Sequence, residues 1–285
     1  MGATLVPLHP CLGYEVQGVD ASKPLAPGVR ELLRGAMATR GLLLLRGQQI
    51  DEPQQVAFAK TFGRISKQGP IQSISPDATY VSNVRADGAF GDVELHFHSD
   101  QMYFEHPLKA IMLYGIEVPA EGGETFFSNS AHVVERMPAA LRSRLEGRNV
   151  VARLDYGALS YGAALKEQVK AQVAQARHPA LAVHEDSGEV IHMMSPDTTK
   201  EIEGYGDAES KALIDELSAL VADDAVVYRH TWREGDLLVW DNTLLQHARS
   251  KFQPSARRTL RRCAIASDHE PVAAARQDTT KETMQ

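Results

Sequence analysis

The stretch Ala110-Ile111-Met112-Leu113-Tyr114 decides the fold class, because a short apolar run among turn-forming residues is typical of a buried β-strand. A second strand signal, Glu124-Thr125-Phe126-Phe127, follows the turn-forming pair Gly122-Gly123. Glycine and proline punctuate the whole region between Tyr80 and Phe127. The middle of the chain therefore predicts a β core.

The regions on either side of this core add short strands and several helices. The run Leu42–Leu45 predicts a buried strand, and Asp51 is a plausible N-cap for a helix that ends at Gly63. Apolar spacing predicts further helices at 29–37, 133–145, 163–177 and 208–220, and strand signals recur at 181–183, 190–193, 226–230, 237–240 and 259–264. Short strands with helices on one side favour a mixed β fold, either a double-sheet jelly roll or a distorted barrel.

The chain is expected to form one domain over residues 1–268. Its 285 residues contain no internal repeat and no Pro-rich or Gly/Ser-rich linker that would divide it. Residues 269–285 are polar, and we expect this C-terminal tail to fray.

Charge and composition favour a small-molecule partner. The 30 basic and 37 acidic side chains give a formal net charge of −7, which disfavours broad attraction to nucleic acid or anionic lipid. No signal peptide is evident, and the most apolar run, Gly41 to Leu45, is far shorter than the ~20 residues of a membrane span. Two cysteines, Cys11 and Cys263, fit a reducing cytoplasm. The sequence is compatible with a monomer or a homo-oligomer.

The segment Leu95-His96-Phe97-His98-Ser99-Asp100 carries the pattern for a metal site. On a strand, residues two apart project to the same face, so His98 and Asp100 can share one ion. Two imidazoles and one carboxylate hold iron(II) and leave positions open for a co-substrate and O2. His247, which follows the strand ending in Trp240, is the natural second histidine. His96 shares the same face, so it stays an alternative ligand.

A basic cluster near the C-terminus predicts an anion site. On a strand, alternation places Arg258 and Arg262 on one face and Arg257 and Arg261 on the other. Whichever pair faces the core must meet an anion, because an unpaired buried guanidinium is very costly. A dicarboxylate co-substrate is such an anion. Thr125, after the two glycines, adds a hydroxyl that can donate to a carboxylate.

Taken together, these motifs resemble the taurine dioxygenase and 2,4-dichlorophenoxyacetate dioxygenase family of iron(II)- and 2-oxoglutarate-dependent enzymes. The resemblance runs from about Gly13 to Asp268. Its parts, in order, are Gly18-Val19-Asp20 with Lys23-Pro24-Leu25, Leu45-Arg46-Gly47-Gln48, Phe58-Ala59-Lys60-Thr61-Phe62-Gly63, His98-Ser99-Asp100, Val118-Pro119 through Thr125, Trp240-Asp241-Asn242, and His247 followed by the arginines.

The resemblance implies a role for each site residue. His98, Asp100 and His247 would bind iron, and Thr125 and Arg258 would hold the distal carboxylate of 2-oxoglutarate. Arg262 matches the arginine that binds an acidic group of the primary substrate in several members of the family. The family fold is a double-stranded β-helix, which agrees with the jelly-roll expectation.

Two departures from the family pattern concern the substrate. Phe97 stands where the family commonly has Trp, and His96 replaces an apolar residue or Pro. The stretch Ile191 to Thr199 also differs from the usual Asn-Pro segment. We therefore predict oxidation, by default hydroxylation, of a small and anionic organic substrate, with release of succinate and CO2. The alternatives are a zinc-binding β-barrel protein with a hydrolytic or structural role, and an oxygenase that acts on a macromolecule.

Overall fold

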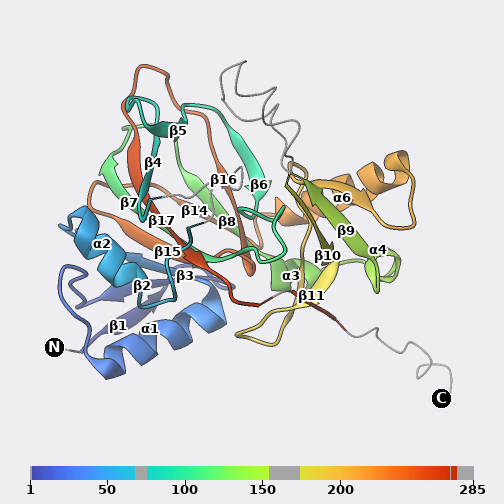
Figure 1. Cartoon of the computed structure of the whole chain (residues 1–285), viewed down its shortest axis with the longest axis horizontal. Helices are drawn as coiled ribbons and strands as arrows, with labels where there is room; N and C mark the ends of the chain where they lie inside the picture. Colours follow the sequence, from blue (N-terminus) through green and yellow to red (C-terminus); the bar gives the residue numbers. More distant parts are fainter. Residues whose placement is uncertain (1, 68–75, 154–173, 270, 275–285) are drawn as a thin grey trace.

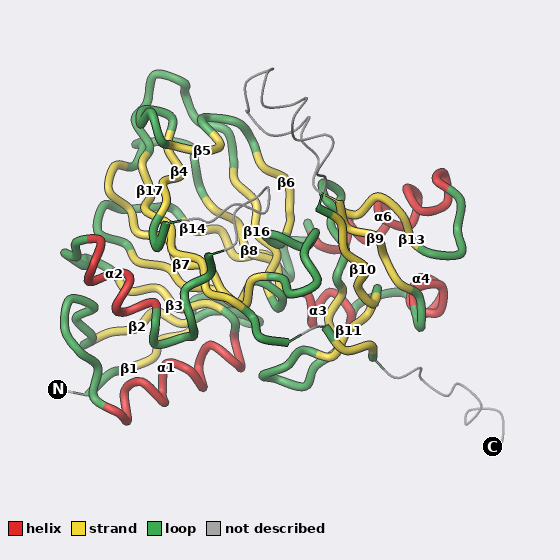
Figure 2. The backbone as a smooth tube through the Cα atoms, in the orientation of Figure 1, coloured by secondary structure: helices red, strands yellow, loops and turns green. Residues whose placement is uncertain are grey.

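The computed structural model describes residues 2–67, 76–153, 174–269 and 271–274, and in these ranges the chain is mostly β-sheet with flanking helices (Figures 1 and 2). The strands are β1 (Thr4–Pro7), β2 (Tyr14–Gln17), β3 (Leu42–Leu45), β4 (Thr79–Ser82), β5 (Gly88–Phe90), β6 (Leu95–His98), β7 (Leu108–Glu117), β8 (Thr125–Asn129), β9 (Asn149–Arg153), β10 (Gln175–Pro179), β11 (Leu181–Val183), β12 (Val190–His192), β13 (Thr199–Ile202), β14 (Val227–His230), β15 (Leu237–Asp241), β16 (Leu245–Arg249), β17 (Thr259–Ala266) and β18 (Val272–Ala273). The helices are α1 (Pro27–Arg40), α2 (Glu52–Ala59), α3 (Ser130–Glu135), α4 (Ala139–Leu145) and α6 (Asp207–Val221).

Two sheets build the part of the fold that carries the predicted site. The larger sheet has the order β1-β2-β3-β15-β7-β17-β4-β5, and the smaller has the order β14-β8-β16-β6. Apolar side chains from both sheets form one core cluster, in which Phe127 of β8 packs edge-on against Trp240 of β15 at 5.2 Å between ring centroids. The predicted strand at 110–114 lies inside β7, as expected.

The second face of the larger sheet is covered by α1 and α2 (Figure 1). In the run Leu42–Leu45, Leu42 and Leu44 point to the core between the sheets, while Leu43 and Leu45 point to the helices. A strand buried on both faces reads as a continuous apolar run, which explains why alternation is missing there. The N-cap prediction at Asp51 is confirmed, since its side chain and that of Gln54 form a capping box. The helix ends at Ala59, earlier than the predicted Gly63.

A third apolar cluster joins α3, α4 and α6 to the short strands β9, β11, β12 and β13. The single helix predicted at 133–145 was wrong, because the chain forms α3 and α4 with Pro138 between them at the N-cap of α4. Proline restricts the preceding residue and lacks the N–H that a continuous helix needs. The helix predicted at 163–177 was wrong at its end, where β10 begins and pairs with β9; residues 163–173 lie outside the described residues.

The remaining predicted elements at 181–183, 190–193, 208–220, 226–230, 237–240 and 259–264 match β11, β12, α6, β14, β15 and β17 to within two residues at each end. In the described part of the tail, β18 pairs with β11. None of the helices in the described residues is both long and apolar enough to cross a membrane.

One buried histidine of β12 gives a stability prediction. His192 is 2 % exposed, and burial lowers its pKa from 6.5 to about 4. Between these two pH values the His192 imidazole is protonated in the unfolded chain and neutral in the folded chain, so the free energy of unfolding falls as the pH falls. The loss reaches about 3 kcal/mol at pH 4.

We therefore expect His192→Leu to flatten the dependence of unfolding free energy on pH between 6.5 and 4. Urea unfolding of both proteins across this range measures the slope, with the exposed His269→Leu as a matched control. Parallel slopes for wild type and His192→Leu would contradict the assignment.

Candidate metal centre

Strands β6 and β16 place two of the predicted ligands opposite each other. His98 and His247 are register partners across this antiparallel pair, and their ring centroids lie 4.2 Å apart. His247 also packs against the Trp240 ring at 4.9 Å. As expected, His247 follows the strand that contains Trp240, β15, and it lies in the middle of the next strand, β16.

Asp100 follows β6 and completes the cluster. Its Oδ1 lies 3.3 Å from His98 Nε2 and 3.8 Å from His247 Nε2, and one ligand atom from each of the three residues lies within 4.8 Å of the others. Asn242 fixes the backbone here, because its Oδ1 accepts from Asp100 N–H at 2.8 Å and its Nδ2 donates to Asp100 O at 2.9 Å. The sequence reasoning used Asn242 only as part of a family motif.

The orientation of His98 is fixed by its own strand. Its Nδ1 lies 2.7 Å from the carbonyl oxygen of His96, and because a carbonyl only accepts, Nδ1 carries the proton and Nε2 is left as a donor to metal. The His96 side chain is exposed and does not enter the cluster. His96 thus contributes a backbone oxygen, where its imidazole was the alternative ligand.

The charges in the cluster suit a cation. Burial acts to raise the pKa of the Asp100 carboxyl, but the charge of Arg262 and the hydrogen bond to His98 hold this pKa well below its usual value. Burial and the neighbouring His98 lower the pKa of His247 to about 3. Burial also opposes protonation of His98, yet contact with Asp100 raises its pKa. An ionised carboxylate and neutral imidazole are the forms that bind metal, so the shifts of Asp100 and His247 favour metal binding, whereas a protonated His98 would release its proton when metal binds.

Arg262 reaches the metal cluster itself. Its Nη2 lies 2.6 Å from Asp100 Oδ2, while Asp100 Oδ1 faces the two histidines. Two other acidic side chains are paired elsewhere, since Asp241 contacts His184 and Glu94 lies near Lys251.

The arginine run divides between faces in part as alternation predicts. Arg257 is exposed and paired with Glu117. Arg261 is buried on the face toward α2, where its donors meet Gln55 Oε1 at 2.6 Å and Ile50 O at 2.8 Å. Arg258 and Arg262 point to the inside. A buried guanidinium can therefore be satisfied by neutral oxygens, which the sequence reasoning did not weigh.

Arg258 is 2 % exposed and lies against the turn at Gly122-Gly123. Its Nε donates to Gly123 O at 3.3 Å, and a Cβ at Gly123 would come within 3.1 Å of this side chain, so glycine is needed for the close approach. Within the described part of the chain, Arg258 has no ion pair, and its Nη1 has no hydrogen-bond partner. Burial and the charge of Arg249 lower its pKa to about 9.

Thr125 begins β8 close to this arginine. Its Oγ1 accepts a hydrogen bond from Trp232 Nε1 at 2.9 Å. With one lone pair occupied by the indole N–H, the Thr125 hydroxyl is free to donate its own proton to an anion. Trp232, like Asn242, is a positioning residue that the sequence reasoning did not identify.

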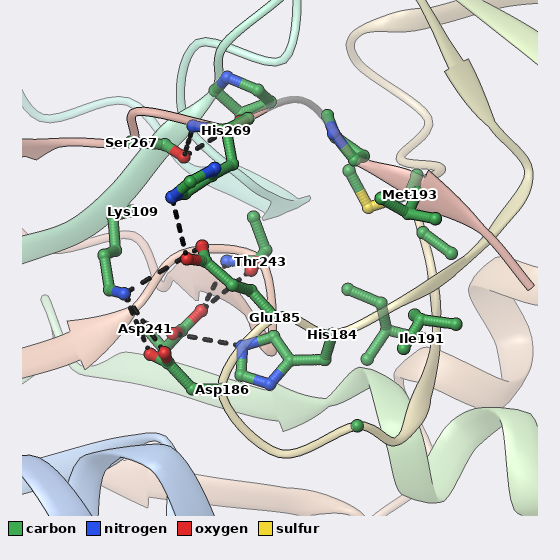
Figure 3. Close-up of a pocket in the computed structure, with 16 residues that line it drawn as sticks. Lys109, His184, Glu185, Asp186, Ile191, Met193, Asp241, Thr243, Ser267 and His269 are labelled. Carbon is green, nitrogen blue, oxygen red and sulfur yellow. Dashed lines mark hydrogen bonds and ion pairs between the residues drawn. The ribbon is translucent and has the colours of Figure 1, made fainter.

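A separate cavity of about 530 Å³ lies beside β11 and β12, and none of the predicted site residues lines it (Figure 3). His184 Nε2 contacts Asp241 Oδ2 at 3.2 Å, and Lys109 Nζ contacts Asp186 at 3.0 Å. The charged groups drawn there are thus paired with one another, so this cavity offers no uncompensated group to a ligand.

Two imidazoles on paired strands and one carboxylate just after β6 are the ligand set of the 2-His-1-carboxylate class, and the described part of the chain also buries a guanidinium without an ion pair, that of Arg258. Residues 4–264 match the family model described as taurine catabolism dioxygenase TauD, TfdA family. The chain therefore belongs to this family and is an iron(II)- and 2-oxoglutarate-dependent dioxygenase.

Several known proteins are similar to the chain along nearly its full length. The alpha-ketoglutarate-dependent 2,4-dichlorophenoxyacetate dioxygenase of Cupriavidus pinatubonensis is 29 % identical over 94 % of this chain and 99 % of its own. The alpha-ketoglutarate-dependent sulfate ester dioxygenase of Pseudomonas putida is 29 % identical over 92 % and 89 %. The structure of AAD-2 with Mn(II) and N-oxalylglycine superposes with a TM-score of 0.82 at 23 % identity, covering 96 % of this chain and 100 % of AAD-2.

Proposed function

We propose that His98, Asp100 and His247 bind the iron(II), and that Thr125 and Arg258 bind the distal carboxylate of 2-oxoglutarate. The observation that carries this proposal is the convergence of the three ligand atoms within 4.8 Å of one another. The buried Arg258, with no partner for Nη1 in the described residues, supports the anion site. When bound, the metal and co-substrate supply the oxidising chemistry with O2, and 2-oxoglutarate leaves as succinate and CO2.

The protein's own contribution is geometry and charge. Asn242 holds the backbone that carries Asp100, and the His96 carbonyl fixes the His98 ring, so the ligands need little rearrangement. Arg262 occupies Asp100 Oδ2 and leaves Oδ1 toward the metal position. This arrangement favours a single carboxylate oxygen as ligand, which keeps positions open for 2-oxoglutarate and O2.

We infer that the substrate is a small organic anion and that hydroxylation is the outcome. Two relatives are named for 2,4-dichlorophenoxyacetate and for sulfate esters, both of which carry a negative charge. The net charge of −7 gives no broad attraction for nucleic acid. Membership of the family disfavours the zinc-binding β-barrel alternative.

The reaction is tested by screening. Protein loaded anaerobically with iron(II) and 2-oxoglutarate is exposed to O2 with small carboxylates, sulfonates, sulfate esters, amino acids and aromatic ethers, and substrate-dependent succinate is measured. Coupled release with an anionic compound is the expected result. Release with neutral compounds alone would contradict the substrate class.

Arg262 gives a prediction about that substrate. Only Nη2 of this side chain contacts Asp100 in the structure, and we propose that its remaining donors meet the substrate anion. Arg262→Ala should raise the substrate KM about tenfold or more, because a contact to the primary substrate is lost. The affinity for 2-oxoglutarate should change little, because this contact does not involve the co-substrate.

The measurement pairs this KM, at saturating iron(II), with the thermal midpoint of the same variant. Arg257→Ala, which removes an exposed arginine, is the control. An unaltered KM with a lowered midpoint would show that Arg262 serves only the Asp100 ion pair.

Three broader predictions stay proposals. The two sheets that enclose one core support a double-stranded β-helix, or jelly roll. The single domain over residues 1–268 with a tail at 269–285 is supported by a family match to residues 4–264. A cytoplasmic location is compatible with two free cysteines.

A further inference from the structure

A second buried arginine, Arg249, lies at the end of the site where the distal carboxylate of 2-oxoglutarate is proposed to bind. It is the last residue of β16, two residues after His247, and it is 4 % exposed. Its register partner across β8 is Thr125. Directly opposed residues on neighbouring strands project to the same face, so Arg249 and Thr125 share the inner face.

Backbone carbonyl oxygens hold the guanidinium of Arg249, but one of its donors has no acceptor in the described residues. Nε donates to Val93 O at 3.0 Å, and Nη2 donates to Phe90 O at 2.8 Å and also to Val93 O. Within the described ranges Nη1 has no hydrogen-bond partner and Arg249 forms no ion pair within 4 Å, although the charge of Asp92 acts on it. The carbonyl oxygens fix its position but do not cancel its charge.

Arg249 and Arg258 both lie against the side chain of Phe252. Their guanidinium carbons lie 5.6 Å and 5.9 Å from the centroid of the same Phe252 ring, and the positive charge of Arg249 acts on Arg258. Arg258 in turn lies against Gly123, two residues before Thr125. Two buried guanidinium groups without an ion-paired carboxylate in the described residues, each with an unused Nη1, favour an anion between them or beside them.

We propose that Arg249 is a second cation of the 2-oxoglutarate site, and that its Nη1 joins Arg258 Nη1 and the Thr125 hydroxyl on the distal carboxylate. This inference rests on the proposed function of the site. A carboxylate has about four lone pairs and can accept from all three groups. The site is then selective for 2-oxo acids that carry a second carboxylate, because a monocarboxylic acid would leave both guanidinium groups buried without an anion.

The proposed contact also connects the co-substrate to the metal strand. The carbonyls that hold Arg249 belong to Phe90, the last residue of β5, and to Val93, two residues before β6, which carries His98. An anion at Nη1 would fix the guanidinium and, through it, the chain that leads into the metal site. Arg249 therefore acts both on the anion and on the start of β6.

The test compares two ligands of equal chain length, 2-oxoglutarate and 2-oxovalerate, which lacks the distal carboxylate. Calorimetric titration of the Mn(II)-loaded full-length protein gives both affinities without turnover. Arg249→Met keeps the aliphatic stem and removes the charge. We expect it to weaken 2-oxoglutarate about tenfold or more and to leave 2-oxovalerate unchanged, while the exposed Arg257→Met changes neither.

An Arg249→Met protein that is folded, by circular dichroism, and binds 2-oxoglutarate as wild type does would overturn the proposal. So would an equal loss for both ligands, which would indicate a purely structural role. If Arg249→Met does not fold, Arg249→Lys decides by the same comparison, because an ammonium keeps the charge but loses the planar donor fork. A wild-type protein that binds neither ligand with Mn(II) and releases no succinate would instead refute the proposed function.

Discussion

Asp100→Ala and His247→Ala should each abolish 2-oxoglutarate-dependent succinate production and most iron(II) binding. Each substitution removes one of three ligand atoms that lie within 4.8 Å of one another, and two remaining ligands do not hold the metal in the geometry that leaves sites for co-substrate and O2. Asp100→Ala also leaves Arg262 without its carboxylate, so a lower thermal midpoint is expected for that variant.

Metal content after equilibrium dialysis and succinate release measure the two effects, and His96→Ala is the matched control. The His96 ring is exposed, and its contribution to His98 is a backbone carbonyl that alanine retains. His96→Ala should therefore keep both iron and activity. The ligand assignment would be wrong if Asp100→Ala and His247→Ala retained full iron affinity while His96→Ala lost it.

Arg258→Ala should weaken 2-oxoglutarate roughly a hundredfold or more. Removing one partner of a buried charge pair costs about 3–5 kcal/mol, and this loss is expected in binding because Arg258 has no protein carboxylate partner in the described residues. In the absence of 2-oxoglutarate the variant should be no less stable than wild type, since it removes an uncompensated buried charge.

Anaerobic titration with 2-oxoglutarate, followed by the visible absorption of the iron complex, gives the affinity. Arg257→Ala removes an exposed arginine one residue away and should bind as wild type does. Unchanged affinity in Arg258→Ala would defeat the assignment of the distal carboxylate.

The sheets were predictable wherever the strand was buried on one or both faces. An apolar pattern predicts the run Leu42–Leu45 and the strand at 110–114, because their side chains enter a core on one or both faces of the sheet. Pro138 indicates the break between α3 and α4, which apolar spacing alone does not show. The end of the helix predicted at 163–177 failed because pairing with β9 decides the conformation of β10, and such long-range pairing leaves no local signal.

The site was predictable in its residue types and less so in its contacts. His98 and Asp100 were expected to share one strand face, but β6 ends at His98 and Asn242 holds the backbone of Asp100 beyond it. His247 was expected from its place after the strand ending in Trp240, and the folded sheet sets it opposite His98. The Arg262 contact to Asp100, the Trp232 contact to Thr125 and the buried Arg249 depend on side-chain directions that one sequence does not encode locally.

The central claim is that His98, Asp100 and His247 bind one iron(II) and that 2-oxoglutarate coordinates this iron directly. The most direct measurement is the visible absorption of the anaerobic full-length protein as iron(II) and 2-oxoglutarate are added. The account predicts a new band that requires both additions, saturates at one equivalent of iron(II) and is lost in His247→Ala. A folded wild-type protein that shows no such band with excess 2-oxoglutarate, or one that shows it unchanged in His247→Ala, would contradict the account.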